Sequence, residues 1–466
     1  MKRTSKTATG FTLIGVFVWV VAVSPPAEAQ ATKSVKPAPD LEAGKQAYLD
    51  NCARCHGPTG AGDGRDARRM FPRPRHLSEG VFKFRTTASG TPPTDEDLFQ
   101  TLSEGLPGSR MPDFQRLPDE TRWQLVYYVK GLAPALQGQK PEPLKLGTDP
   151  GPKKVNLAKG KELYTLNGCN ACHGNLGRGN GPSAATLVDQ WNEPIRAADL
   201  TQGWNYRSGS SPKEIMARLM TGIDGTPMPS YAEAVKADEV WDLAYYVHSL
   251  QVEPRWGRTI EAAKVSGPFP NAIDDPQWAK VPRTDLRLSG NFYRDQQILP
   301  TTIRAISIQA LYNEKEILFR LSWHDPSENR EFPSDAVALA FLPDLKLKWR
   351  TGSLRSWPAS SDATALNLSK WDASYSNAAY DAFLLGGVIP PGTVGEKPLK
   401  QLDAKVEYIE GGWTLLIRRP LEGKLASSVK LEPGKPVAVG LMVWDGGNNE
   451  QGRHRANSSW VDLVLK

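Results

Sequence analysis

All four cysteines of the 466-residue chain fall in two short groups of the form Cys-x-x-Cys-His. The groups are Cys52, Cys55 and His56, and Cys169, Cys172 and His173. Two thiols at this spacing can each add to a vinyl group of one haem, and the adjacent imidazole then reaches the iron. The pattern is the attachment signature for c-type haem. A zinc site usually needs four Cys or His ligands close together, and the histidine beside each pair disfavours a simple redox disulfide.

Each group is followed, at the same distance, by a methionine that precedes a proline. These residues are Met111 and Met228. A thioether is a soft, neutral ligand that favours ferrous iron and raises the reduction potential of a His-ligated haem. We predict that the two methionines are distal axial ligands, opposite His56 and His173. With both axial positions filled by protein, the iron has no open site for substrate, which favours electron transfer over catalysis at the haem.

The two groups belong to an internal repeat. The cysteines, histidine and methionine of the first copy recur in the second, each displaced by 117 positions. Each copy opens with a stretch of helical character, at residues 41–51 and 157–167, that leads into its Cys-x-x-Cys-His group. Each closes with an amphipathic segment, at residues 119–132 and 237–250, in which apolar residues recur at helical spacing. We therefore expect one small helical fold used twice.

Residues 41–252 resemble two class I cytochrome c domains in tandem. The resemblance is carried by the paired Cys-x-x-Cys-His groups, by the matched methionines and by the glycine-rich stretch after each group. It implies two small all-α domains, each wrapped around one haem c whose edge is exposed for electron exchange. We place the domains at residues 41–136 and 154–252, with linkers at residues 30–40, 137–153 and 253–269.

The chain changes character after about residue 253. Residues 302–312 and 317–323 are rich in β-branched and aromatic residues, and later runs of this kind are separated by clusters of Gly, Pro, Asn and Asp. We expect residues 270–466 to form a mostly antiparallel β-sandwich. The predicted fold class is therefore multidomain α plus β, with two all-α domains ahead of one β domain.

This third region resembles the haem-b-binding gamma subunits of ethylbenzene dehydrogenase and related molybdenum enzymes of the dimethyl sulfoxide reductase group. The phrases that carry the resemblance are Leu318-Phe-Arg-Leu-Ser-Trp323-His-Asp325-Pro326, Asn367-Leu-Ser-Lys-Trp371 and Val443-Trp444-Asp445-Gly446. The family implies one b haem held between a methionine and a lysine. Here no methionine lies around Ser356-Trp357-Pro358, and Arg455 stands where the lysine is expected. His454 and Met442 are the candidate substitutes, and His324 is interpreted as a turn residue.

The first 29 residues have the features of an export signal. Three cations precede an apolar run from Phe11 to Val23, and the small residues Ala27 and Ala29 follow. We predict cleavage after Ala29, a periplasmic location and no later transmembrane segment. An uncleaved anchor is the alternative, but the run is shorter than the roughly 20 residues that a spanning helix needs. The formal charge of +6 includes the three signal cations, so nucleic acid is not an expected partner.

Together these features predict a di-haem c electron-transfer protein with a possible third haem, of type b. We expect it to be the cytochrome subunit of a molybdenum oxidoreductase such as a nitrite oxidoreductase, with molybdenum-containing catalytic subunits and iron-sulfur subunits as partners. Two alternatives stay open. A di-haem oxidase or peroxidase would need Met111 or Met228 to swing away from its iron. In the other alternative, the β domain only docks the cytochrome onto a partner.

Overall fold

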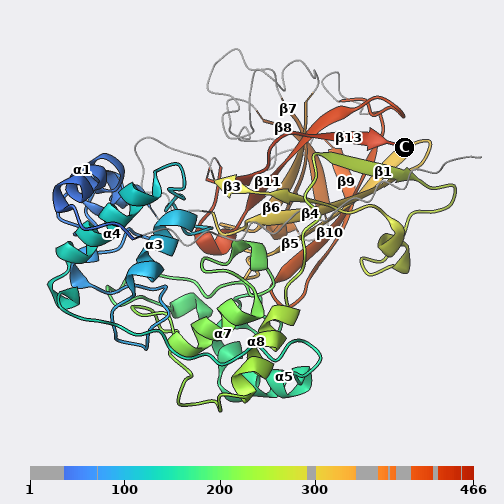
Figure 1. Cartoon of the computed structure of the whole chain (residues 1–466). Helices are drawn as coiled ribbons and strands as arrows, with labels where there is room; N and C mark the ends of the chain where they lie inside the picture. Colours follow the sequence, from blue (N-terminus) through green and yellow to red (C-terminus); the bar gives the residue numbers. More distant parts are fainter. Residues whose placement is uncertain are drawn as a thin grey trace, which may run out of the picture. The chain divides into compact units, whose positions relative to one another are not determined.

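The structure, a computed structural model, describes residues 36–70, 72–290, 301–342, 366–375, 378–384, 400–422, 429–452 and 454–466. The predicted signal peptide at residues 1–29, the first part of the linker at 30–40 and the phrase at 356–358 lie outside the described residues. No helix in the described ranges is long and apolar enough to cross a membrane. Two helical modules come first along the chain, and a region of strands follows (Figure 1).

The two helical modules, domain 1 and domain 2, have the same order of α-helices. In domain 1 the helices are α1 (Leu41–Asn51), α2 (Ala53–His56), α3 (Asp95–Glu104) and α4 (Asp119–Leu132). In domain 2 they are α5 (Leu157–Leu166), α6 (Cys169–His173), α7 (Pro212–Thr221) and α8 (Glu239–Ser249). The helices predicted at the start and end of each copy are confirmed, which bears out the prediction of two small helical domains.

Equivalent helices begin with equivalent side-chain caps. Asp40 caps α1 and Asn156 caps α5, each accepting a hydrogen bond from the backbone N–H three residues later, at 3.0 and 3.1 Å. The helices α3 and α7 each begin with a capping box. These caps satisfy backbone N–H groups that the helix itself leaves unpaired. The repeat in the sequence therefore fixes where the helices of both domains start.

The first and last helices of each domain cross at a glycine. A Cβ atom on Gly44 of α1 would lie 2.4 Å from a carbonyl oxygen of α4, and one on Gly160 of α5 would lie 2.2 Å from a carbonyl oxygen of α8. Only a residue without a Cβ allows helices to approach this closely. A pair of tyrosines lies beside each crossing, with ring centroids 5.2 Å apart in domain 1 and 5.5 Å apart in domain 2. The crossing holds the Cys-x-x-Cys-His group, which follows the first helix, against the domain core.

The third region, the β domain, contains 13 strands among the described residues, all in one sheet. They are β1 (Thr259–Lys264), β2 (Thr284–Arg287), β3 (Ser289–Gly290), β4 (Ala305–Tyr312), β5 (Glu316–His324), β6 (Ala336–Leu342), β7 (Leu366–Asp372), β8 (Ala378–Leu384), β9 (Lys400–Tyr408), β10 (Gly412–Pro420), β11 (Val437–Trp444), β12 (Ala456–Asn457) and β13 (Val461–Leu465). The expectation of a mostly antiparallel β domain is confirmed, because among the strands of the described residues the parallel pairings are those of β1 with β13 and of β1 with β4.

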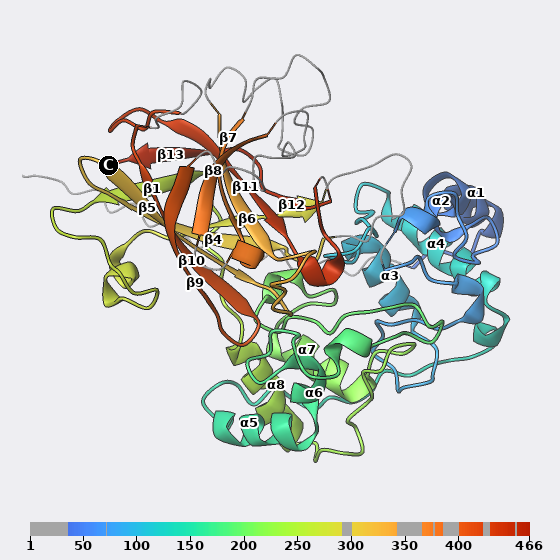
Figure 2. The same cartoon turned by 180° about the vertical axis from the view of Figure 1, so that it is seen from behind.

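The sheet closes on itself and encloses the largest apolar cluster. Its hydrogen-bonded order runs β13-β1-β4-β5-β10-β9-β8-β7-β6-β11, and β11 pairs again with β13 (Figures 1 and 2). The core inside takes alternate residues from β4, β5 and β10 and from β6 and β11. Each large side chain that is fully buried in this way contributes about 1.5–3 kcal/mol. The sandwich is thus one continuous sheet folded over a single core.

Strand β6 is buried on both of its faces. Its odd-numbered residues from 337 to 341 are large and join the main core. Its even-numbered residues from 336 to 340 are all alanine and join a second apolar cluster with Met442 and Trp444. Because side chains alternate across a strand, this second cluster lies on the opposite face of the sheet.

Candidate functional site

The two Cys-x-x-Cys-His groups occupy the same place in both domains, directly after the first helix. In domain 1 the backbone N–H groups of Cys55 and His56 donate to the carbonyl oxygen of Cys52, at 3.0 and 2.9 Å. In domain 2 the corresponding residues form α6. A helical turn brings residues three and four apart onto one face, so both thiols and the imidazole can approach one ligand together. None of the four cysteines forms a disulfide.

Both predicted proximal histidines are oriented by a backbone carbonyl. His56 Nδ1 lies 3.1 Å from the carbonyl oxygen of Arg75, and His173 Nδ1 lies 2.9 Å from that of Ala198. A carbonyl oxygen only accepts, so Nδ1 carries the proton and Nε2 keeps its lone pair for a metal. Burial lowers the pKa of both imidazoles, which favours the neutral form that binds metals.

The predicted distal methionines lie in loops with matching hydrogen bonds. In domain 1 the Leu106 N–H donates to the Met111 carbonyl at 3.0 Å, and the Met111 N–H donates to Ser109 Oγ at 3.1 Å. In domain 2 the same two bonds around Met228 measure 3.1 and 3.2 Å. These bonds hold each methionine backbone in one position, so the equivalent side chains start from equivalent places.

Each methionine shares an apolar cluster with the cysteine group of its own domain. Met111 packs against the cluster that includes Cys52, and Met228 packs against the cluster that includes Cys169. The structure therefore places the first cysteine of each group and the predicted distal methionine in one apolar core per domain. This is the arrangement that a ligand clasped between a histidine and a methionine requires.

A buried tyrosine fixes the turn that follows each predicted histidine ligand. The hydroxyl of Tyr48 donates to the carbonyl oxygen of Gly57, and that of Tyr164 donates to the carbonyl oxygen of Gly174, both at 2.7 Å. Burial raises the pKa of both tyrosines, so their hydroxyl groups stay protonated and remain donors. The sequence analysis missed these residues, although each copy of the repeat has a tyrosine in its first helix, nine residues before Gly57 in domain 1 and ten before Gly174 in domain 2.

Buried guanidinium groups supply a test of whether the site fits haem. Nη1 and Nη2 of Arg75 in domain 1, and Nε and Nη1 of Arg218 in domain 2, are buried and have no hydrogen-bond acceptor in the described ranges. Burial lowers the pKa of each guanidinium to about 10. Buried guanidinium groups usually pair with carboxylates or phosphates. The two propionates of a haem are such carboxylates, and Arg75, whose carbonyl oxygen is bonded to His56, carries a donor of this kind; Arg218 instead bonds the carbonyl oxygen of Arg85.

Domain 1 also contacts the start of the methionine loop of domain 2. The buried Arg85 donates to the carbonyl oxygen of Thr221 at 2.9 Å and forms an ion pair with Asp224 at 2.7 Å. Ser89 Oγ and the Gly90 N–H also donate to Asp224, both at 2.9 Å. The loop that carries Met228 is therefore held from outside its own domain.

The β domain contacts the segment of domain 2 that orients His173. Asp199, which follows Ala198, accepts a hydrogen bond from His324 Nδ1 at 2.7 Å. Arg196 donates to the side-chain oxygen of Asn448. His324, interpreted from the sequence as a turn residue, is the last residue of β5 and forms an ion pair across the two domains. No local pattern could reveal this pairing, because its partners are 125 residues apart.

The two sequence candidates for a b-haem ligand lie in different elements. Met442 is fully buried in β11 and pairs with Asn457 of β12. His454 lies outside β12, in the turn between β11 and β12, where its backbone N–H donates to the carbonyl oxygen of Gln451 at 3.0 Å. Arg455 is buried, and its Nε donates to Asn457 Oδ1 at 2.9 Å. The assignment of either residue to a b haem stays a prediction.

A residue that the sequence analysis did not single out lies opposite Met442. Lys370 of β7 is in register with Ala338 of β6, which is in register with Met442 of β11. The lysine and the methionine thus flank the alanine row on one face of the sheet. The Lys370 ammonium forms an ion pair with Asp372 at 2.9 Å. The signal that could have found it is the phrase Asn367-Leu-Ser-Lys-Trp371, which was matched without assigning the lysine a role.

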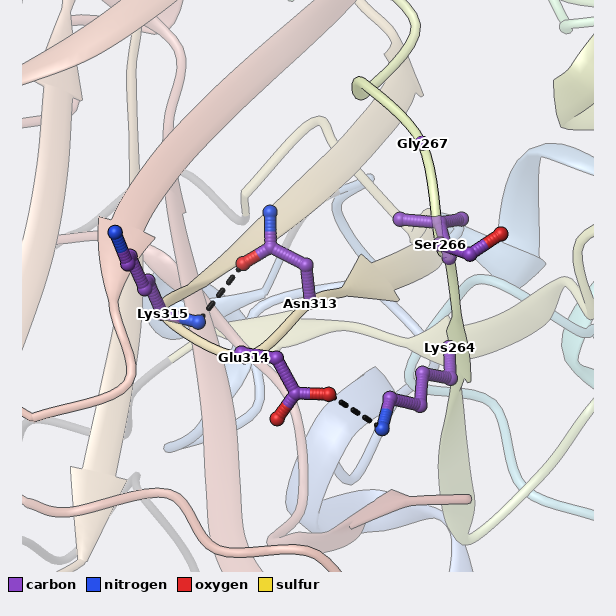
Figure 3. Close-up of a pocket in the computed structure, with 7 residues that line it drawn as sticks. Lys264, Ser266, Gly267, Asn313, Glu314 and Lys315 are labelled. Atoms are coloured by element: carbon purple, nitrogen blue, oxygen red, sulfur yellow. Dashed lines mark hydrogen bonds and ion pairs between the residues drawn. The ribbon is translucent and has the colours of Figure 1, made fainter.

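A surface pocket lies at the start of β5, and its lining residues do not include a candidate haem ligand (Figure 3). It lies between the end of β1 and the turn that joins β4 to β5. Lys264 pairs with Glu314 at 2.6 Å, and the Lys315 N–H donates to Asn313 Oδ1 at 2.9 Å (Figure 3). These pairings are those of an ordinary polar turn, and we assign no ligand to the pocket.

Comparison with known proteins finds one family model and several relatives that each match part of the chain. The cytochrome c family model matches residues 41–133 and 157–251. A protein named as a respiratory nitrate reductase heme subunit of Haloferax mediterranei is 23% identical over 197 residues, which are 41% of this chain and 68% of that protein. Chlorate reductase subunit gamma of Ideonella dechloratans is 23% identical over 220 residues, 45% of this chain and 86% of that protein. One chain of a reducing HAO-like protein complex of Kuenenia stuttgartiensis is 41% identical over 47% of this chain and its own full length, with a TM-score of 0.45.

Proposed function

We propose that residues 41–133 and 157–251, which match the cytochrome c family model, each carry one covalent haem c and that the protein transfers electrons. Cytochrome c domains imply covalently bound haem. One observation carries the proposal for both domains. The same cysteine group, the same imidazole–carbonyl bond and the same methionine loop occur twice in one chain.

The proposed ligands follow the repeat. Thioether bonds to the first haem come from Cys52 and Cys55, and those to the second haem come from Cys169 and Cys172. The axial ligands are His56 with Met111 in domain 1 and His173 with Met228 in domain 2. The matching geometry of the two loops supports the same assignment in both domains.

The residues around each proposed haem suit electron transfer. The bound haem supplies a one-electron redox centre at its iron. The carbonyl oxygens of Arg75 and Ala198 hold the imidazoles in one orientation. The loop hydrogen bonds restrain the methionines, and the apolar clusters exclude water from that side. A ligand set restrained in this way changes little between oxidation states.

Ligand binding to the reduced protein tests the proposal against the oxidase or peroxidase alternative. Potentiometric titration of the purified haem protein should show two one-electron centres, and the reduced protein should not bind carbon monoxide. Rapid binding of carbon monoxide or reaction with peroxide at either haem would favour an enzyme with an open iron. The restrained methionine loops support the first outcome.

We further propose that the partner is a molybdenum oxidoreductase in the periplasm. Two observations support this step. Relatives carry the names of nitrate reductase and chlorate reductase subunits. The third region also resembles gamma subunits of such enzymes in the sequence phrases quoted above. Export would use the signal at residues 1–29. Purification from native cells tests both points, because the protein should copurify with molybdenum and iron-sulfur subunits and should begin at residue 30. A cytoplasmic protein with no molybdenum in the purified complex would contradict the proposal.

A b haem in the β domain is a second proposal, for which the alanine row is the specific support. Met442 and Lys370 flank that row in register, and alanine side chains leave room on the sheet. Pyridine haemochrome analysis should then give two c haems for each b haem. A Met442→Leu variant should lose the b haem, and a Met220→Leu control should keep it. If only c haem is found, the β domain is a module that docks the cytochrome onto a partner.

A further inference from the structure

Three carboxylates from distant parts of the chain converge at one end of the β domain. Asp325 follows β5, Asp335 precedes β6 and Asp445 follows β11. One carboxylate oxygen from each lies within 4.8 Å of the other two. All three residues are buried, with exposed fractions of 0%, 0% and 1%. Carboxylates are rarely buried at all without a cation or a full set of donors.

Hydrogen bonds fix the direction of these carboxylates without neutralising them. Asp335 accepts from the N–H groups of Gly446 and Asn329, both at 2.8 Å. It also accepts from Trp413 Nε1 at 3.0 Å. The Asp445 side chain accepts from the backbone N–H of Asn448 at 3.1 Å. Donors of this kind orient carboxylate oxygens and leave lone pairs for a further partner.

One oxygen in the cluster is left without any donor. Oδ1 of Asp325 accepts from the Ser327 N–H at 3.2 Å. Oδ2 of the same residue is buried and has no hydrogen-bond partner in the described part of the chain. An unpaired buried acceptor of this kind costs about 1–3 kcal/mol, more if charged. The orphaned oxygen is evidence, independent of the clustering, that a positive ligand belongs here.

A fourth carboxyl group lies beside the cluster. Glu450, with an exposed fraction of 1%, accepts from the Thr302 N–H at 3.2 Å and lies near Asp445. Burial, followed by repulsion from neighbouring carboxylates, raises the pKa of Glu450 to about 8. The guanidinium groups of Arg196, in domain 2, and Arg304 interact with this group of acids, and Arg196 hydrogen-bonds to Asn448. Among the described residues, these two cations are fewer than the four carboxyl groups.

We propose that Asp325, Asp335 and Asp445 bind one calcium ion. Calcium takes oxygen ligands at 2.3–2.6 Å, so two ligands on opposite sides of one ion are up to about 5 Å apart. One oxygen from each of the three residues lies within 4.8 Å of the others, so the three are close enough to share one such ion. Zinc prefers nitrogen and sulfur ligands, and magnesium keeps several waters in a strict octahedron. A buried set of three carboxylates suits calcium better.

The calcium site lies where the β domain meets domain 2. Asp325 directly follows His324, which pairs with Asp199 of domain 2. Asn448, beside Asp445, binds Arg196 of the same segment. That segment also contains Ala198, whose carbonyl orients His173. The ion therefore stabilises the end of the β domain that supports this segment, and the proposal does not depend on the haem assignments.

Metal analysis of the purified full-length protein tests the site. After dialysis against calcium-free buffer, calcium titration followed by calorimetry should show one bound ion per chain, with magnesium unable to displace it. Calcium should also raise the unfolding temperature of the β domain, followed by far-UV circular dichroism. Absence of calcium binding, or equal binding of magnesium, would overturn the proposal.

Two variants separate the site from general destabilisation. Asp325→Asn should lose calcium binding and should be at least as stable as the wild-type protein without calcium, because it removes repulsion. Asp403→Asn changes an exposed carboxylate of the same sheet and should keep one calcium ion. If Asp325→Asn fails to fold, Asp445→Asn serves as the second variant. Retention of calcium affinity in a folded Asp325→Asn protein would refute the assignment.

Discussion

Domains 1 and 2 have the same internal design and different surroundings. Both place their cysteine group after a capped helix, orient the histidine with a backbone carbonyl and hold the methionine in a hydrogen-bonded loop. The two domains differ in the contacts that they receive from the rest of the chain. The Met228 loop of domain 2 is contacted by Arg85 of domain 1, and the segment before its Asp199 is contacted by the β domain. Equivalent ligands can therefore sit in different electrostatic fields.

A duplicated module therefore need not give two redox centres of equal reduction potential. Reduction potential depends on the axial ligands first, and then on burial, nearby charge and hydrogen bonds. The ligands proposed for the two domains are the same, so any difference in potential must come from the surrounding residues. The contacts to domain 2 are charged, so that domain is the one most affected by changes at its boundaries.

The largest expected effect comes from removing a distal ligand. Met111→Ala and Met228→Ala should each lower the potential of one haem by an amount on the order of 0.2 V, since axial ligands set potentials over a range of about 0.8 V. The altered haem should also bind carbon monoxide. Spectroelectrochemical titration measures both effects, with the haem of the unaltered domain as the internal control. If neither substitution shifts a potential, the methionines are not ligands and the likeness between the two loops is only structural.

The next-largest expected effect is a loss of stability when the contact between domains 1 and 2 is removed. Asp224→Ala leaves the buried Arg85 without its ionic partner, so it should destabilise domain 2 by about 2–3 kcal/mol. Asp113→Ala removes an exposed carboxylate beside the methionine of domain 1 and should change stability by less than about 0.5 kcal/mol. Chemical denaturation followed at the haem absorbance gives both values. Equal losses in the two variants would mean that the contact with Arg85 does not distinguish the domains.

A smaller effect tests the helix crossings. Gly44→Ala and Gly160→Ala each introduce a Cβ that would lie 2.4 or 2.2 Å from a carbonyl oxygen. Overpacking of this kind costs typically 1–3 kcal/mol, and the shorter approach in domain 2 should make Gly160→Ala the more damaging. Gly138→Ala, in open space, is the control, although its positive backbone angle gives it a small penalty of its own. Unchanged denaturation midpoints in both variants would show that the helices can separate without loss.

The smallest effect is a pH dependence confined to domain 2. Burial alone would raise the pKa of Asp199, but bonds from His324 and Thr201 outweigh it and hold the pKa below its ordinary value. A depressed pKa stabilises the fold at higher pH, and this contribution is lost as the carboxylate takes a proton below about pH 4. With side chains 30% and 15% exposed, the pair should contribute less than about 1 kcal/mol. Stability measured between pH 6 and pH 3 should fall less in Asp199→Asn than in the wild-type protein, and parallel curves would contradict the role of the pair.

The two helical domains could be predicted from the sequence because the patterns that specify them are short and occur twice. The spacing from Cys52 to Met111 recurs from Cys169 to Met228, and the helices on either side have apolar residues at helical spacing. The β domain was predicted only as a class of fold. Its closure depends on β13 pairing with both β1 and β11, and strand pairing over such distances leaves no short pattern.

The residues that sequence reasoning missed act through contacts between distant segments. The carbonyl oxygens that orient His56 and His173 belong to backbone groups, which any residue type could supply. The carboxylates of Asp325, Asp335 and Asp445 meet only because three strands end at one place. A resemblance to a family pointed to Met442, whereas the register of β6, β7 and β11 added Lys370.

The central claim is that each helical domain binds one haem c covalently. Pyridine haemochrome analysis of the purified protein, scaled to polypeptide concentration, tests it most directly. The account predicts two c haems per chain in the wild-type protein and one in a variant with Cys169 and Cys172 both replaced by alanine. A wild-type protein with fewer than two c haems per chain, or a double variant that still holds two, would contradict it.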